Sequence, residues 1–450
     1  MSHFQQKLSP LSTSAFDLLS TFQQLQGLAY LHDNNHPIIA FLPQKFLVFQ
    51  QSSYQQFQQK SFNHYQIESN TQSILEFSKF NSSSAIETTD LCFQGGYIGF
   101  FSYDYSAKQF IETSHHPQPS FILGEYHSFL KCHKDGWYFH SDEEHAQTIY
   151  DQINQLLKQP KSEPIAELSL LEKCQPRWSK QNYLTAFEQV QEYIRAGDCY
   201  QINLTQEFTA PAQGTLLSKA QTFWQLTHAP YAGYLKLNQF ELLSCSPELF
   251  IEFQPNRQVK TRPIKGTMPR FDNPEQDQIS KDKLTHSEKD QAENVMIVDL
   301  LRNDLGLYAE TGSVHTTKLF EIESFNQVHH MVSEITATLK PEINPMQMLL
   351  SALPGGSITG APKIRAMQII EELEGSPRGA YCGSLGYFNF DGTGRWNILI
   401  RSIQKYQEQV SVWAGGGITI ASNAEAEYQE CFDKISAMLD LLNTWQKTDD

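Results

Sequence analysis

The sequence of 450 residues contains no run of about 18 apolar residues, so we expect no membrane-spanning helix. Residues 1–10 lack a basic stretch followed by an apolar one, which favours a cytoplasmic location. The seven cysteines include no Cys-x-x-Cys pair, and this favours reduced thiols over disulfides or a structural zinc site. Basic residues are also scarce. The 34 Lys and Arg oppose 50 Asp and Glu, a net charge of -16 that argues against a nucleic-acid or membrane surface.

The composition, with 40% hydrophobic residues, is sufficient for a large buried core. Residues 1–165 are rich in Gln, Ser, Phe and Tyr, and residues 50–66 show no strong helical or strand period. Residues 93–101 predict a buried strand interrupted by glycines. A polar segment with prolines at residues 158–178 predicts a connection to the second half.

The second half has a clearer pattern. Ser179 is a candidate N-cap of a helix that ends at Gly197, and a strand is expected at 200–206. Strands clustered in runs, without regular β-α-β alternation, predict an α+β fold of large antiparallel sheets with helices on the outside. Further strands are expected at 240–253, 257–263, 381–390, 396–405 and 410–420, and helices at 280–303, 324–338, 345–352, 361–373 and 424–443.

A reactive lysine is the first candidate for chemistry. The segment Thr-Arg-Pro-Ile-Lys-Gly-Thr sets Lys265 between an apolar residue and a glycine. Burial lowers the pKa of a lysine by up to about 3–5 units, so such a segment can hold a neutral, nucleophilic amine. An ordinary solvated or salt-bridged lysine is the alternative that this segment alone leaves open.

Two predicted helices carry pairs of acids at helical spacing. Asp290 and Glu293 share one face, as do Glu427 and Glu430, and Lys434 follows one turn later. Carboxylates from two elements, with positions left for water and an anionic substrate, are what Mg²⁺ prefers. The spacing predicts a magnesium site if the helices converge, although either pair alone is also typical of a solvated face.

Two glycine-rich segments can present backbone N–H groups to an anion. Gly415, Gly416 and Gly417 follow an expected strand, and residues 354–363 precede a helix, with Ser357 as an additional donor. Neither segment matches a dinucleotide or phosphate-loop fingerprint.

Two further side chains can take part in binding or proton transfer. His330 is a candidate proton donor or acceptor, because histidine titrates near neutral pH. Arg401 is expected to end an apolar strand, where its guanidinium can bind a carboxylate through two bonds. A core histidine and a strand-end ion pair are the structural alternatives.

Four motifs in order resemble the chorismate-utilising enzymes: Pro-Ile-Lys-Gly-Thr around Lys265, and the motifs at residues 292–304, 355–365 and 415–430. The likeness is strong over 178–445 and recognisable at 90–105. It implies two large sheets flanked by helices. It also implies an N-terminal region at 1–165, like that of anthranilate synthase component I, and a chorismate-binding catalytic domain at 175–446.

The resemblance implies an Mg²⁺ ion held directly by Glu293 and Glu430, with Asp290 and Glu427 holding its bound waters. The ion would bind the ring carboxylate of chorismate, which the three glycines and Lys434 would also reach. The resemblance therefore implies that the two acid pairs form one magnesium site.

The same resemblance implies that Tyr381 and Arg401 hold the enolpyruvyl carboxylate, with Ser357 near the substrate. Lys265 would add at C2 of chorismate as the C4 hydroxyl leaves, and ammonia would then add at C4 and expel the lysine. Glu248, in Ser-Pro-Glu-Leu-Phe, would be the acid for the leaving hydroxyl. The implied product is 4-amino-4-deoxychorismate, formed without pyridoxal phosphate.

His330 would lie near C4, and Gln201 stands where the water-adding branch of the family has a lysine, which favours ammonia. A glutaminase of the usual class needs a Gly-x-Cys-x-Gly elbow, and no cysteine here has that context. Ammonia would therefore come from a separate glutamine amidotransferase subunit.

Two alternatives stay open. Anthranilate synthase component I shares most of these motifs but has a small residue in place of Lys265. A non-catalytic partner of an amidotransferase is expected to have lost the metal-binding carboxylates, and all four are present.

Overall fold

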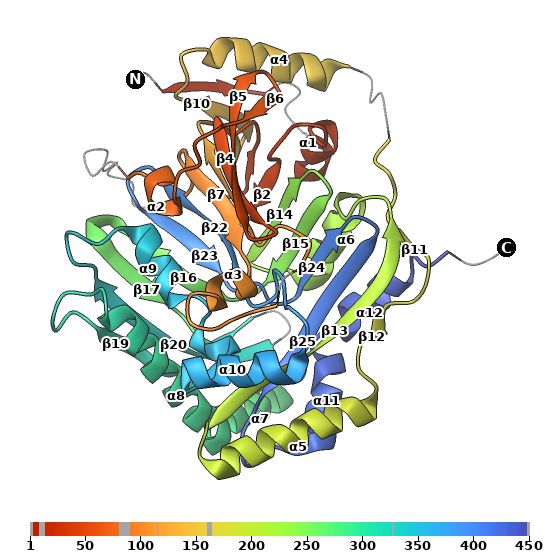
Figure 1. The fold of residues 1–450 in the computed structure, drawn as a ribbon, viewed down its shortest axis with the longest axis vertical. Helices are drawn as coiled ribbons and strands as arrows, with labels where there is room; N and C mark the ends of the chain where they lie inside the picture. The colour runs from red at the N-terminus through yellow and green to blue at the C-terminus, as the bar shows by residue number, and fades with distance from the viewer. Residues whose placement is uncertain are drawn as a thin grey trace.

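The computed structural model describes residues 3–8, 14–80, 91–114, 116–159, 164–325 and 328–447. Its strands form two large sheets with helices around them (Figure 1). Every pairing between the named strands is antiparallel, which confirms the predicted fold class.

The first sheet contains 13 strands of the described chain. In spatial order they are β1 (Phe4–Lys7), β10 (Gly136–Ser141), β9 (Ser128–His133), β3 (Ile38–Ala40), β2 (Ala29–Leu31), β14 (Tyr231–Leu237), β15 (Phe240–Ser246), β24 (Ser402–Tyr406), β25 (Gln409–Ile418), β13 (Gln201–Gln213) and β11 (Ser169–Leu170). The short strands β12 (Gln175–Pro176) and β21 (Gly360–Ala361) also pair with β13.

The second sheet contains 12 strands of the described chain. Their order is β18 (Ile264–Pro269), β20 (Val328–Thr338), β17 (Gln258–Thr261), β16 (Leu249–Phe253), β23 (Gly394–Asn397), β22 (Ser384–Asn389), β7 (Gly96–Phe101), β8 (Phe121–Tyr126), β4 (Lys45–Gln50), β5 (Ser53–Ser61) and β6 (His64–Ile67). β19 (His315–Ser324) pairs with β20 as well.

The two sheets pack face to face through one hydrophobic core. Phe100 from the second sheet stacks on Phe240 from the first, with ring centroids 5.0 Å apart. Within the second sheet, β7 lies very close to its neighbour β8, since a Cβ on Gly99 would lie 2.0 Å from the carbonyl oxygen of Ile122. The buried, glycine-containing strand predicted at 93–101 is therefore confirmed.

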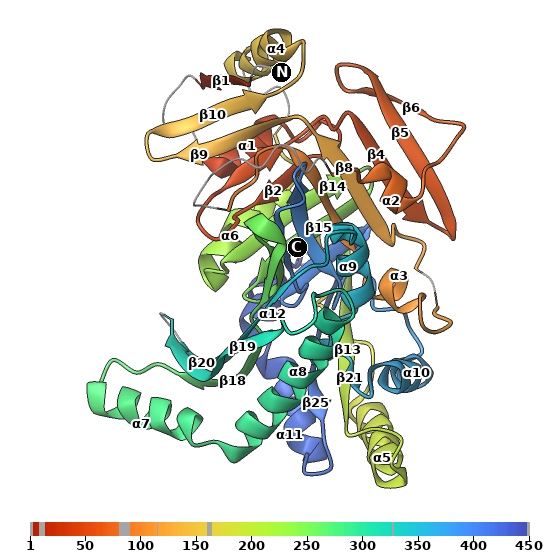
Figure 2. The same cartoon turned by 90° about the vertical axis from the view of Figure 1, so that its left-hand side faces the viewer.

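Helices cover the outer faces of both sheets (Figures 1 and 2). They are α1 (Ala15–Thr21), α2 (Ile74–Phe77), α3 (Tyr103–Ala107), α4 (Ala146–Lys158), α5 (Lys180–Ala196), α6 (Leu217–Thr227), α7 (Pro274–Thr285), α8 (Glu288–Gly306), α9 (Pro345–Ala352), α10 (Lys363–Glu374), α11 (Ala424–Asp433) and α12 (Ser436–Asn443), with 3-10 turns at Pro255–Arg257 and Gly356–Ile358. None of the described helices combines the length and apolarity that crossing a bilayer requires.

The helix predicted at 324–338 is wrong, because this segment contains strand β20. Val328, Val332 and Ile335 are β-branched, and such side chains lose rotamer freedom in a helix and pack well in a sheet. Residues 329–333 of β20 are buried on both faces, whereas buried and half-buried residues alternate from 334 to 338. The alternation that marks a strand with one solvent face is therefore missing only from the first part of this strand.

Several other predicted elements are divided or displaced. The helices expected at 280–303 and 424–443 are each two helices, α7 with α8 and α11 with α12. The strand expected at 396–405 is interrupted between β23 and β24. Residues 50–66, where no period was visible, form most of the β5–β6 hairpin at one edge of the second sheet.

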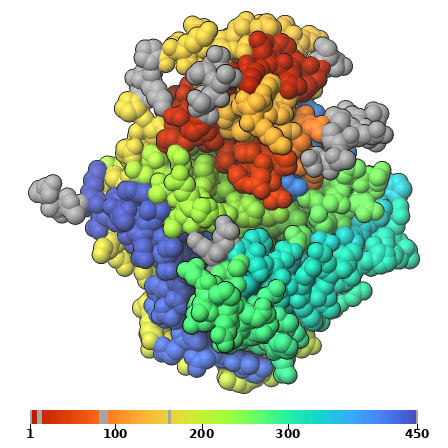
Figure 3. Space-filling view, turned by 180° about the vertical axis from the view of Figure 1, so that it is seen from behind, coloured from red at the N-terminus to blue at the C-terminus, as the bar shows by residue number. Residues whose placement is uncertain are grey.

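Both sheets contain strands from both halves of the chain. β2 pairs with β14 in the first sheet, and β7 pairs with β22 in the second. In the space-filling view, the N-terminal segment covers the upper part of the molecule and the second half forms the lower part (Figure 3). The division into regions 1–165 and 175–446 stays a prediction.

Candidate active site

A cavity of about 510 Å³ lies between β18, β25 and the two acidic helices, α8 and α11. Thirteen of the fifteen predicted residues line it: Glu248, Lys265, Asp290, Glu293, His330, Ser357, Tyr381, Arg401, Gly415, Gly417, Glu427, Glu430 and Lys434. Gly416 and Gln201 are the two that do not. Residues from distant parts of the sequence thus share one wall.

Lys265 lies in β18 and points across the cavity to α8. Its Nζ is 2.6 Å from Oε2 of Glu293, and its side chain is 24% exposed. Of the two settings that the segment left open, the structure therefore has the salt-bridged one, with the amine in an ion pair. The glycine after it is required, since Gly266 has a φ of 93° and its Cβ would lie 3.0 Å from Cγ of Asp290.

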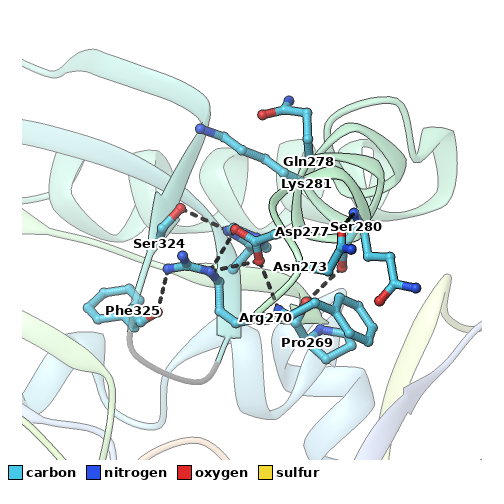
Figure 4. Close-up of polar contacts among 12 residues, drawn as sticks. Pro269, Arg270, Asn273, Asp277, Gln278, Ser280, Lys281, Ser324 and Phe325 are labelled. Atoms are coloured by element: carbon cyan, nitrogen blue, oxygen red, sulfur yellow. Dashed lines mark hydrogen bonds and ion pairs between the residues drawn. The ribbon is translucent and has the colours of Figure 1, made fainter.

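A polar network fixes the far end of β18 (Figure 4). Arg270 donates from Nε to both carboxylate oxygens of Asp277 on α7, at 2.8 and 3.0 Å, and from a terminal nitrogen to the carbonyl of Phe325. Asp277 also contacts Nε2 of His329 at 3.0 Å, and Ser324 contacts Nδ1 of the same ring at 2.8 Å. The strand that carries Lys265 is thus tied to α7, β19 and β20.

The four acids face the cavity from two helices, as their spacing predicted. Glu293 pairs with Lys265, and Glu430 pairs with Lys434 at 2.6 Å. Lys289 adds a third ammonium group, 3.9 Å from Oε1 of Glu293. In the part of the chain that the structure describes, no three His, Cys, Asp or Glu side chains converge closely enough to hold an ion by themselves. Lysine cations instead neutralise the cluster here.

The environments of the two acids on α11 differ. Burial raises the pKa of Glu427 above its usual value, and a hydrogen bond from Ser422 only partly opposes this. Burial also disfavours ionisation of Glu430, but the ammonium groups of Lys434, Lys265 and Lys289 together outweigh it and hold the pKa of Glu430 below its usual value.

A divalent cation fits the chemistry of these side chains. Oε1 of Glu293 is buried and accepts no hydrogen bond from any described residue, which leaves a hard oxygen donor unused. Gly416 lies against α11, where a Cβ would lie 2.8 Å from Oε2 of Glu427 and 3.2 Å from Oε1 of Glu430. The absent side chain therefore lets the acidic helix approach the sheet.

The three glycines lie inside β25, which matches the strand expected at 410–420, so they belong to that strand and do not follow it. Gly415 is opposite Thr205 of β13, yet the Thr205 N–H donates to Glu374 on the other side. In an antiparallel ladder this makes the pair non-hydrogen-bonded, so the N–H of Gly415 points away from β13. The carbonyl of Gly415 on that same edge accepts a 2.7 Å bond from Lys434. Gly415 therefore still exposes backbone polar groups to the cavity, through a strand edge.

Glu248 and His330 have pKa values suited to proton transfer. Burial raises the pKa of Glu248 to about 7, although the Ile264 N–H, Lys265 and Arg401 all favour its charged form. Burial and Arg401 lower the pKa of His330 to about 4, so its ring is neutral at pH 7. His330 Nδ1 lies 2.8 Å from Oγ1 of Thr267. At neutral pH, Glu248 can therefore donate a proton and His330 can accept one.

Arg401 does not end a strand, because it lies in the bend between β23 and β24 with a φ of 50°. Such backbone is strained for a residue other than glycine, and strain of this kind concentrates at functional sites. Arg401 forms no ion pair with any side chain that the structure describes, and burial lowers its pKa. Beside it in the cavity wall, Tyr381 stacks on Trp413 with ring centroids 5.8 Å apart. An unpaired guanidinium beside an aromatic wall suits a carboxylate ligand.

Gln201 lies behind the cavity wall. Its side chain is fully buried, and neither polar atom finds a partner among the described residues. It packs beneath β25, where a Cβ on Gly417 would lie 2.6 Å from Nε2 of Gln201. Ser357, by contrast, lines the cavity from the 3-10 turn Gly356–Ile358.

Sequence reasoning missed several residues of the cavity wall. Asn203 shares a strand face with Gln201, and Lys289 stands four residues before Glu293, so spacing could have indicated both. Thr267 and Trp413 each stand two residues from a predicted site residue on the same strand, Lys265 and Gly415, so strand alternation could have indicated them as well. The missed wall residues are Asn203, Pro247, Ile264, Gly266, Thr267, Met268, Lys289, Ile297, Ile358, Ile400, Trp413, Ala414 and Ile435.

Comparison with known proteins places this site in context. A family model described as "chorismate binding enzyme" matches residues 29–440. Aminodeoxychorismate synthase component 1 of Escherichia coli (strain K12) is 42% identical over 361 residues, covering 78% of this chain and 77% of that protein.

Solved structures with the same fold include two that span most of the chain. Anthranilate synthase component I from Streptococcus pneumoniae TIGR4 superposes with a TM-score of 0.77 at 29% identity, covering 89% of this chain and 91% of that one. The menaquinone-specific isochorismate synthase from Escherichia coli has a TM-score of 0.73 at 17% identity, covering 98% and 94%. At that identity, the second likeness concerns the fold alone.

Proposed function

Because the chain belongs to the chorismate-binding enzyme family, we propose that it converts chorismate and ammonia to 4-amino-4-deoxychorismate, the precursor of 4-aminobenzoate in folate biosynthesis. The single observation that carries this proposal within the family is the position of Lys265. Its amine faces the same cavity as Glu248, Arg401 and the four carboxylates. An amine at this position can form a covalent intermediate with the substrate, whereas a small side chain at the same position cannot.

The cavity offers separate groups for the two carboxylates of chorismate. The unpaired guanidinium of Arg401, beside Tyr381, binds the enolpyruvyl carboxylate. The edge of β25 and Lys434 face the ring carboxylate, with Ser357 near the substrate. Gln201 supports the strand from behind.

The reaction proceeds in two displacements. Lys265 first gives its proton to solvent and leaves its ion pair with Glu293, and its neutral amine then forms a bond to C2 as the C4 hydroxyl departs. Glu248 gives that hydroxyl a proton, so it leaves as water. Ammonia then bonds to C4 and the lysine is expelled from C2, while the neutral His330 accepts the proton that the new nitrogen loses. Chorismate and ammonia thus become 4-amino-4-deoxychorismate and water.

An Mg²⁺ ion is part of the proposal. Glu293 and Glu430 would hold it directly, and Asp290 and Glu427 would hold its water molecules. When bound, it supplies positive charge that neutralises and orients the dianionic substrate.

Ammonia is supplied by a separate glutamine amidotransferase subunit. The name "component 1" of the E. coli relative supports a partner subunit. A cytoplasmic location completes the proposal, and the seven cysteines, all unpaired in the structure, support it.

We expect purified protein with chorismate, Mg²⁺ and ammonium chloride to form 4-amino-4-deoxychorismate, because the cavity contains every group that the two displacements require. The product is converted to 4-aminobenzoate by an added lyase and measured by chromatography. Anthranilate with pyruvate would identify the rival activity, anthranilate synthase. Absence of any turnover would support a non-catalytic partner.

The pH dependence of kcat should reflect the protonation of Glu248. Its pKa of about 7 means that the proton-donating form is lost as the pH rises through that value. We expect Glu248→Gln to lower kcat by roughly 10²–10⁴-fold at pH 6. The ratio of wild-type to variant kcat should then fall above pH 7, and taking this ratio cancels the changing fraction of free ammonia. A ratio that stays constant from pH 6 to pH 9 would mean that another group donates the proton.

A further inference from the structure

The first acid of each pair along the chain is held by a serine hydroxyl. We call Asp290 and Glu427 the outer carboxylates. Ser287 Oγ donates to Oδ2 of Asp290 at 2.5 Å, and Ser422 Oγ donates to Oε1 of Glu427 at 2.7 Å. The two contacts occur on different helices and at different spacings, three and five residues, so they do not follow from one local motif.

The backbone of a glycine packs against each outer carboxylate, on a different side from the serine. The ideal Cβ of Gly266 would lie 3.0 Å from Cγ of Asp290, and that of Gly416 would lie 2.8 Å from Oε2 of Glu427. No other side chain of the described residues donates a hydrogen bond or forms an ion pair with either carboxylate. One oxygen of each group is therefore fixed by serine, and the other is free to accept.

The inner acids are held differently. Glu293 and Glu430 pair with the ammonium groups of Lys265 and Lys434, each at 2.6 Å. A bound cation can replace an ammonium group at a carboxylate because both are positive. A serine hydroxyl is neutral, so a bound cation does not take its place at the carboxylate. The serine contacts can therefore persist when the cation is bound.

We infer that Ser287 and Ser422 are positioning residues, which orient the outer carboxylates as fixed acceptors for the water molecules of the bound cation. This inference rests on the metal site of the proposed function. Hydrogen bonds to groups around a metal set ligand orientation, and losing one typically weakens metal affinity about 10–100-fold.

At the start of α11, one residue caps the helix and another holds the carboxylate of Glu427. Asn423 is the N-cap and accepts from the Ala426 N–H, whereas Ser422 accepts from the Thr419 N–H and donates to Glu427. Asn423→Ala therefore removes the cap and leaves the contact to Glu427 in place. Ser422→Ala keeps the cap and removes the contact to Glu427, together with the bond from the Thr419 N–H, whereas Ser422→Thr keeps the hydroxyl for both.

The test measures binding of Mn²⁺ alone to the full chain, by the loss of the free-ion signal in electron paramagnetic resonance. Mn²⁺ prefers the same oxygen ligands as Mg²⁺. We expect Ser422→Ala to raise the Kd about tenfold and Ser422→Thr to restore it to within about twofold of wild type. Asn423→Ala should lower the melting temperature without changing the Kd.

Ser287 is both cap and donor, so it is replaced by glycine, which is itself a favourable N-cap residue. Ser287→Gly should also raise the Kd about tenfold. The inference is overturned if both serine variants bind Mn²⁺ like wild type, or if Asn423→Ala weakens binding as much as Ser422→Ala. Failure of the wild type to bind Mn²⁺ would overturn the metal site itself.

Discussion

Replacing Lys265 by alanine is expected to slow formation of 4-amino-4-deoxychorismate at least about 100-fold, because the first displacement loses its nucleophile. It should also remove any covalent adduct between substrate and protein. Initial rates are measured with chorismate, Mg²⁺ and ammonium chloride. The adduct is measured by intact mass after acid quenching during turnover.

Lys281→Ala is the matched control. This lysine lies on α7, and its side chain is not part of the cavity wall. Its removal should leave both the rate and the adduct mass unchanged. An adduct that persists in Lys265→Ala would show that another residue is the nucleophile. An unchanged rate without an adduct would show that ammonia attacks chorismate directly.

Glu430→Gln is expected to raise the Mg²⁺ concentration for half-maximal rate by at least roughly 100-fold. The substitution removes a negatively charged ligand. In the wild type the Lys434 ammonium lies 2.6 Å from Oε1 of Glu430. The substitution removes the carboxylate that neutralises this ammonium group, so its positive charge repels the incoming cation. A magnesium titration of the initial rate measures the shift, and calorimetric titration with Mg²⁺ measures binding without turnover.

Glu425→Gln provides the comparison on the same helix. Glu425 is 61% exposed and pairs with Lys180 on α5, away from the cavity. Its neutralisation changes the net charge of the chain by the same amount as Glu430→Gln, and we expect a wild-type titration curve. If Glu430→Gln also reaches the wild-type rate at low Mg²⁺, its carboxylate is not a ligand.

The acidic helices were predictable because local spacing alone puts Asp290 with Glu293 and Glu427 with Glu430. The fold class followed from the order of strands and helices, which the sequence carries without any contact information. The roles proposed for these residues stay predictions, whereas their convergence on one cavity is a property of the structure.

Other features depend on contacts between distant segments. The sequence near Lys265 leaves both a desolvated and a salt-bridged amine open, and only the approach of α8 places Glu293 beside it. Arg401 seemed to end a strand, but its bend arises where the chain passes from the second sheet to the first. The first part of β20, residues 329–333, is buried on both faces and so lacks the alternation that would indicate a strand.

Each sheet combines strands from both halves of the chain, so early strands have no partner until late in synthesis. β2 ends at Leu31, and its partner β14 begins at Tyr231, about 200 residues later. At roughly 5–20 residues per second, the ribosome needs about 10–40 s to provide that partner. During this interval the early strands have unpaired edges, which can pair with other chains. A nascent chain of this protein is therefore expected to depend on chaperones until its second half emerges.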